Sequence, residues 1–198
     1  MKKNPPSLTL RLGFDNKSIE KIEEVKDCDF INPIGEFKIS GIRIWGKTDK
    51  YVNGLEIFYD GQSIGPKVGW KGNVALEKKD FLYNDQELIQ IFVTYGKKKS
   101  FQYIEKIVFR TLRIQNNEIM SYNFGNDVDL QKCDKMAIDG YYIRKISFGL
   151  GAHLSYIEAV FIEKSICEYL KKNPKQNLIN FEMKSNTEDS ENYKKQKQ

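Results

Sequence analysis

The chain has 198 residues, and 40% of them are hydrophobic, which is enough for one well-buried core but not for several large domains. Its 32 basic and 27 acidic residues are interleaved, so the net charge of +5 indicates a solvated surface and argues against a nucleic-acid partner. No stretch reaches the roughly 20 apolar residues that a membrane-spanning helix needs, so no transmembrane segment is expected.

The cysteine and histidine content excludes two kinds of small scaffold. Cys28, Cys133 and Cys167 are odd in number and far apart, and His153 is the single histidine. A disulfide framework needs paired cysteines, and a structural zinc site needs closely spaced ligands. We therefore expect three reduced thiols, no metal site and no cofactor.

The spacing of apolar residues predicts strands and short helices along the chain. In residues 8–14 apolar side chains alternate with Thr, Arg and Gly, which predicts a half-buried strand. Ile19, Ile22 and Val25 are spaced as in a short helix over 18–25. Residues 39–163 contain short β-branched or aromatic runs broken by Gly, Asn and Asp, which is typical of an antiparallel domain. We expect a short helix over 165–172.

An internal pattern recurs three times along the chain. Three expected strands end on an aromatic residue followed by glycine: Trp45-Gly46, Tyr95-Gly96 and Phe148-Gly149. Five to seven residues later a second strand opens on Tyr51, Tyr103 or Tyr156, and these tyrosines lie 52 and 53 residues apart. Three such hairpins can bury their apolar faces only against one another. The pattern predicts three sheets around a pseudo-threefold axis, with Leu55, Ile107 and Val160 facing inward.

These features resemble the jacalin-type lectins, in particular residues 39–45, the glycine-rich loop 65–73 and the last hairpin from 148 onward. The resemblance implies an all-β fold, a β-prism of three antiparallel sheets with pseudo-threefold symmetry and short helical or disordered terminal extensions. It divides the chain into an N-terminal extension of a strand and a short helix (1–36), the prism domain (37–163) and a C-terminal extension (164–198). The polar composition after about residue 184 predicts disorder.

The resemblance also implies a site. In this family a Gly-x-x-x-Asp loop of the last hairpin holds a sugar, usually mannose or galactose, because glycine allows close backbone approach and a carboxylate accepts two hydroxyl hydrogen bonds. Here Leu154 stands in the Gly place and Glu158 in the Asp place, so both positions depart from the motif. The candidate sugar-binding residues are Gly151, His153, Leu154, Ser155, Tyr156, Glu158 and, from the glycine-rich loop, Trp70.

The residue inventory favours a binding protein over an enzyme. The sequence has no second histidine, no nucleophile motif and no phosphate-cradling loop, so we expect no catalytic residues. Two hypotheses remain: a lectin-fold module that binds a mannose- or galactose-type glycan, or a structural adapter of a large intracellular assembly, cytoskeletal or ciliary, that has lost sugar binding. Because the first residues lack the apolar core of a signal peptide, we expect a cytoplasmic protein, and the adapter hypothesis associates it with the cytoskeleton.

Overall fold

The computed structural model describes residues 7–14, 23–25, 38–59, 62–68, 77–82, 85–98 and 101–172. These residues form mainly strands, which are β1 (Ser7–Gly13), β2 (Glu23–Val25), β3 (Ile39–Lys47), β4 (Tyr51–Tyr59), β5 (Gln62–Val68), β6 (Glu77–Leu82), β7 (Gln86–Lys98), β8 (Phe101–Arg113), β9 (Glu118–Phe124), β10 (Asp134–Ala137), β11 (Tyr141–Leu150) and β12 (Leu154–Glu163). A 3-10 helix, η1 (Leu130–Lys132), and an α-helix, α1 (Lys164–Lys172), complete the described elements.

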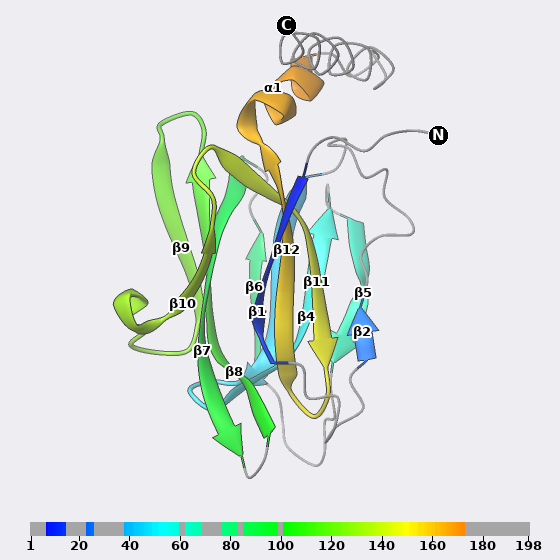
Figure 1. Ribbon diagram of the computed structural model, residues 1–198, viewed down its shortest axis with the longest axis vertical. Helices are drawn as coiled ribbons and strands as arrows, with labels where there is room; N and C mark the ends of the chain where they lie inside the picture. Colours follow the sequence, from blue (N-terminus) through cyan, green and yellow to red (C-terminus); the bar gives the residue numbers. More distant parts are fainter. Residues whose placement is uncertain are drawn as a thin grey trace, which may run out of the picture.

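The strands form three four-stranded antiparallel sheets, each built around one long hairpin (Figure 1). The strand orders are β5-β4-β3-β6, β10-β7-β8-β9 and β1-β12-β11-β2. In each sheet the second hairpin strand pairs with one flanking strand and the first hairpin strand with the other. This shared order confirms the predicted β-prism of three sheets.

The third sheet is completed by the N-terminal segment. Strand β1, predicted at 8–14, pairs with β12 from Ser7 opposite Ile162 to Gly13 opposite Tyr156. Strand β2 pairs with β11, so the helix predicted over 18–25 is wrong for residues 23–25; sheet hydrogen bonds to β11 outweigh a weak helical spacing. A boundary at residue 37 therefore does not separate the prism from an extension.

The core lies between the inner faces of the three sheets. Leu55, Ile107 and Ile157 are fully buried at corresponding positions of β4, β8 and β12. The prediction that Val160 faces inward is wrong, because its neighbours Ala159 and Phe161 are the buried residues and adjacent strand residues point to opposite faces.

A register shift in each hairpin explains the error at Val160. One extra residue bulges from the second strand of each hairpin, and these residues are Asn53, Glu105 and Ser155. The bulges lie 52 and 50 residues apart, whereas the tyrosine pattern has spacings of 52 and 53. Counting from the bulge makes His153, and not Tyr156, the counterpart of Tyr51 and Tyr103.

Helix α1 covers the opposite end of the prism from the hairpin turns, as the orange helix in Figure 1 shows. It confirms the predicted C-terminal helix, and its Ile166 and Cys167 are buried against Tyr142 and Ile162. Cys133 and Cys167 are free thiols. Cys28 and the segment after residue 184, for which we predicted disorder, lie outside the described residues.

The fold predicts which leucines carry its stability. We expect Leu55→Ala to lower the free energy of unfolding by about 2–5 kcal/mol, because the truncation leaves a cavity where the three sheets meet. Leu8→Ala is the matched control, since Leu8 on the edge strand β1 is 48% exposed and should change stability by less than about 0.5 kcal/mol. Urea unfolding measures both, and equal effects would contradict a core at Leu55.

Candidate functional site

The candidate site is the end of the prism where the turns of the three long hairpins lie, here called the hairpin end; it is opposite α1 in Figure 1. Four aromatic side chains gather there and are called the ring cluster: Tyr51, Phe101, Tyr103 and His153. Tyr51 opens β4, Phe101 and Tyr103 open β8, and His153 ends the turn between β11 and β12. Each of the three sheets therefore contributes to one cluster.

His153 is the centre of the ring cluster. Its ring stacks on Tyr51 with centroids 4.2 Å apart and an interplanar angle of 25°, and it is tilted against Tyr103 at 5.0 Å and Phe101 at 6.2 Å. His153 Nδ1 lies 3.2 Å from Asn53 Oδ1, and because an amide oxygen only accepts, Nδ1 carries the hydrogen. Stacking and this hydrogen bond fix the His153 ring, which is buried. The rings of Tyr51, Phe101 and Tyr103 are half-buried.

The arrangement follows from the register of the hairpins. Directly after Tyr51, Tyr103 and His153 the chain places three fully buried residues, Val52, Ile104 and Leu154. Because neighbouring strand residues point to opposite sides, burial of one directs the preceding ring away from the core. The three rings can then meet over the end of the prism.

Glycine makes room for one of these rings. A Cβ on Gly96, which pairs with Tyr103, would lie 2.5 Å from the Tyr103 ring, so that ring packs directly over the backbone of β7. Burial, and to a smaller extent the charge of Glu105, raises the pKa of the Tyr103 hydroxyl. A tyrosine hydroxyl is protonated at neutral pH even at its ordinary pKa of 10, so this one can donate a hydrogen bond to a ligand.

A polar contact fastens the β3–β4 turn beside the ring cluster. Asp49, in the left-handed region at φ 59°, accepts hydrogen bonds from the backbone N–H of Asn126 at 2.6 Å and from its side-chain amide at 2.7 Å. Lys106 Nζ lies 3.0 Å from the same carboxylate and also donates to the Asn126 carbonyl at 2.7 Å. The turn of the first sheet is thereby attached to the second sheet. The Asn126 backbone hydrogen bond and Lys106 lower the pKa of Asp49.

The structure brings only some of the predicted sugar-binding residues to this end. Gly151 donates its N–H to the His153 carbonyl at 3.0 Å, which closes the last turn. Leu154 is fully buried in the core, and Ser155 is a buried bulge residue whose carbonyl accepts from Phe14 N–H. At this turn Gly151 is half-buried and His153 is buried, so of these predicted residues Gly151 is the more accessible to a ligand.

Tyr156 and Glu158 lie farther along β12, on the outer face of its sheet. The Arg11 guanidinium covers the Tyr156 ring at 3.5 Å from its centroid, and Glu158 accepts a hydrogen bond from Ser147 at 3.3 Å. At about 3.3 Å of rise per residue, Glu158 is about 13 Å from Leu154. Of the two residues aligned with the Gly-x-x-x-Asp motif, Leu154 thus lies in the core and Glu158 on the outer face of the sheet. Trp70 lies outside the described residues.

The sequence pattern marked Tyr51 and Tyr103 only as the first residues of expected strands and did not single out Phe101. A signal was present, because all three aromatic residues flank expected turns. Their proximity to His153 depends on the register shifts and on the prism itself, neither of which is visible in the spacing of residue types.

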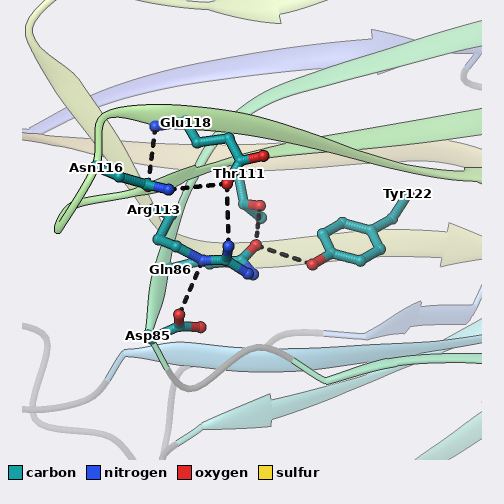
Figure 2. A network of polar contacts seen from close by, with 7 residues as sticks. All are labelled: Asp85, Gln86, Thr111, Arg113, Asn116, Glu118 and Tyr122. Atoms are coloured by element: carbon teal, nitrogen blue, oxygen red, sulfur yellow. Dashed lines mark hydrogen bonds and ion pairs between the residues drawn. The ribbon is translucent and has the colours of Figure 1, made fainter.

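Two polar clusters at the helix end consist of contacts within the protein. Figure 2 shows Arg113 between Asp85 and Glu118, with 3.0 Å to each carboxylate. Beneath α1, the buried Arg144 lies 3.0 Å from the buried Glu87 and donates to Cys167 Sγ at 3.2 Å. Both clusters join strands to one another, so we assign them to the fold.

Among the described residues no group of His, Cys, Asp or Glu side chains is placed to hold a metal ion. Of the helices described, none has the length and apolar character to cross a membrane.

Comparison with known proteins identifies the fold. No protein-family model and no curated protein sequence matches the chain. Among solved structures, Calystegia sepium agglutinin superposes with a TM-score of 0.58 at 16% identity over 81% of this chain and 99% of that one. Recombinant single-chain jacalin gives 0.57 at 10% identity over 79% and 94%, and the mannose-binding lectin from champedak 0.54 at 10% over 82% and 99%. The chain therefore has the jacalin-type lectin fold.

The Asp49 contact predicts a dependence of stability on pH. Because the folded-state pKa of Asp49 is lowered, its contribution is present above its ordinary pKa of 3.8 and is lost as the pH falls through the folded value. We expect Asp49→Asn, which tolerates the left-handed backbone, to be less stable than the native chain at neutral pH, with the difference shrinking as the pH falls below about 4. Thermal unfolding across this range measures it, and an unchanging difference would contradict a role of the charge.

Proposed function

We propose that this chain is a non-enzymatic binding module that takes a glycan at the hairpin end, with the sugar rings against the ring cluster. The observation that carries the proposal is the meeting of three half-buried aromatic rings, from two sheets, around a histidine from the third. Lectins of the same fold, one of them named as mannose-binding, support a glycan as the class of ligand.

The chemistry of the ring cluster suits a sugar. The C–H face of a pyranose is apolar and packs against an aromatic face, while its hydroxyls need hydrogen-bond partners at the rim. Tyr51 and Tyr103 provide both, because each combines an apolar ring with a hydroxyl. The rings are held by stacking on His153 and by Gly96, so little side-chain entropy is lost when a ligand binds.

The outer-face position of Glu158 does not favour a sugar site of the Gly-x-x-x-Asp type. Its carboxylate already accepts from Ser147, and its neighbour across the strand pair is Arg11. Leu154, at the Gly position, is part of the core and provides no close backbone approach. For these reasons the proposal places the ligand on the ring cluster and assigns Glu158 to the sheet surface.

The adapter hypothesis is favoured by a different surface. Leu8 and Leu10 on the edge strand β1 are 48% and 37% exposed, and an exposed apolar edge can receive another protein. This surface lies along the prism, whereas the ring cluster is at its end. Binding of glycans that is lost with the rings supports the lectin function, and absence of any glycan binding supports the adapter.

Loss of a ring should remove glycan binding without unfolding the chain. We expect Tyr51→Leu and Tyr103→Leu each to weaken binding of the glycans selected on an array by about tenfold or more, because leucine keeps apolar volume but lacks the flat face and the hydroxyl. Isothermal titration measures the affinity, and thermal unfolding verifies that each variant folds. Ile119→Leu is the control, since Ile119 is exposed at the helix end.

A second variant distinguishes binding of the sugar at the ring cluster from binding at Glu158. If the ring cluster binds the glycan, Glu158→Ala leaves the dissociation constant unchanged within about twofold, because Glu158 is remote from the rings. A loss of glycan binding in Glu158→Ala, together with full binding in Tyr51→Leu, would indicate that the sugar binds at Glu158. That result would overturn the proposal.

A further inference from the structure

We propose that the ring cluster holds one sugar residue, the residue at the free (nonreducing) end of a glycan, and does not bind along the length of a polysaccharide. This inference rests on the proposed function and specifies its ligand. It follows from the spacing of the four rings, from the angles between their planes and from the three hairpins that carry them.

The ring cluster has the size of a single sugar. Measured between ring centroids, His153 lies 4.2 Å from Tyr51, 5.0 Å from Tyr103 and 6.2 Å from Phe101, and Phe101 lies 6.1 Å from Tyr103. A pyranose is about as wide as one of these aromatic rings. The four rings together therefore offer a surface for one sugar residue, whereas a platform for a polysaccharide needs rings spread along several residues of the glycan.

The half-buried rings do not share a plane. Tyr51 is inclined by 25° to His153 and Tyr103 by 57°, so the planes of the two tyrosine rings differ by at least 32°, the difference between these angles. Phe101 is inclined by 51° to Tyr103. An extended polysaccharide presents its apolar C–H faces along one line and needs aromatic faces in a common plane. Rings inclined to one another instead suit one sugar that they contact from different sides.

Contacts within the protein keep the rings at these angles. His153 stacks on one face of Tyr51. The Tyr103 ring packs over the backbone of Gly96, where an added Cβ would lie 2.5 Å from two of its carbon atoms. A ligand could turn the two tyrosine rings into one plane only by breaking this packing, which costs free energy. The inclined arrangement is therefore the one that a glycan meets.

The three hairpins surround the cluster, and this favours the end of a glycan over its interior. Tyr51 belongs to the first sheet, Phe101 and Tyr103 to the second and His153 to the third. A residue inside a linear glycan has glycosidic bonds at both ends of its ring, so the glycan would have to leave the cluster in two directions. A terminal residue needs only one way out.

The charges of the hairpin end do not distinguish acidic from neutral sugars. The described residues of this end include Lys47 and Lys97, but also Glu24, which pairs with Gly149, and Glu77, which pairs with Gly46. Because both signs are present, selection by shape is what the ring cluster can provide.

The first experiment varies the length of the glycan. The full chain is titrated with the methyl glycosides of mannose, galactose, glucose and N-acetylglucosamine and with linear oligosaccharides of each sugar of increasing length. We expect an oligosaccharide to bind no more than about threefold more tightly than the methyl glycoside of the same sugar, since the added residues lie outside the cluster. An affinity that rises with every added residue would indicate a polysaccharide platform and overturn this inference, while the proposed function would remain intact.

The second experiment blocks one end of the glycan. The oligosaccharide that binds best is extended by one residue of a different sugar, either at its nonreducing end or, as the matched control, at its reducing end. We expect the first extension to weaken binding by about tenfold or more and the second to leave the dissociation constant within about twofold. Full binding after extension at the nonreducing end would show that internal residues are recognised and would overturn the inference.

The third experiment asks whether all rings contact the same sugar residue. Tyr51→Leu and Phe101→Leu are each titrated with the methyl glycoside and with the longest oligosaccharide of the same sugar, and thermal unfolding verifies that each variant folds. If one residue contacts every ring, each variant weakens both ligands by the same factor, within about twofold. A variant that weakens the oligosaccharide alone would place its ring at a second sugar residue and contradict the inference. Absence of binding to every glycan tested would remove the proposed function itself.

Discussion

The structure depends on one constraint: the apolar inner faces of three sheets can be removed from water only by closing on one another. Each face is too small to form a core alone, so burial of Leu55, Ile107 and Ile157 requires all three hairpins at once. The same constraint explains the N-terminal strand. Without β1 along β12, the third sheet would end at the edge of a hairpin strand whose Phe161 and Ile157 belong to the core.

Register shifts fit the hairpins to this closed shape. Every long hairpin carries two, one on each strand, with Ser40, Ile89 and Arg144 as the extra residues near the helix end and Asn53, Glu105 and Ser155 near the hairpin end. A bulge bends its strand and redirects the residues that follow, which is how three strands can converge at both ends of a prism. At one end the redirected Arg144 reaches the buried Glu87. At the other end the rings meet.

The two ends of the prism are built differently. The helix end is closed by α1 and by ion pairs whose partners all belong to the protein, which holds the strands together. The hairpin end is built from turns, and turns tolerate changes of residue without loss of the core. A fold does not determine its ligand, because binding resides in groups added to a common scaffold. The prism forms with Leu154 and Glu158 at the positions that the resemblance aligns with the Gly-x-x-x-Asp motif.

By itself the sequence determined the strand-rich composition, the three hairpins, the opening strand and the C-terminal helix, because alternation of apolar residues and turn residues are local properties of the chain. It also indicated that the last turn departs from the jacalin-type motif. Tertiary structure alone decided that residues 23–25 join a sheet, that Val160 faces outward and that His153 is the counterpart of Tyr51 and Tyr103. Each of these depends on a bulge or on a partner strand far away in the chain. A one-residue shift of register reverses which face a side chain occupies, and periodicity within a single strand does not reveal where such a shift occurs.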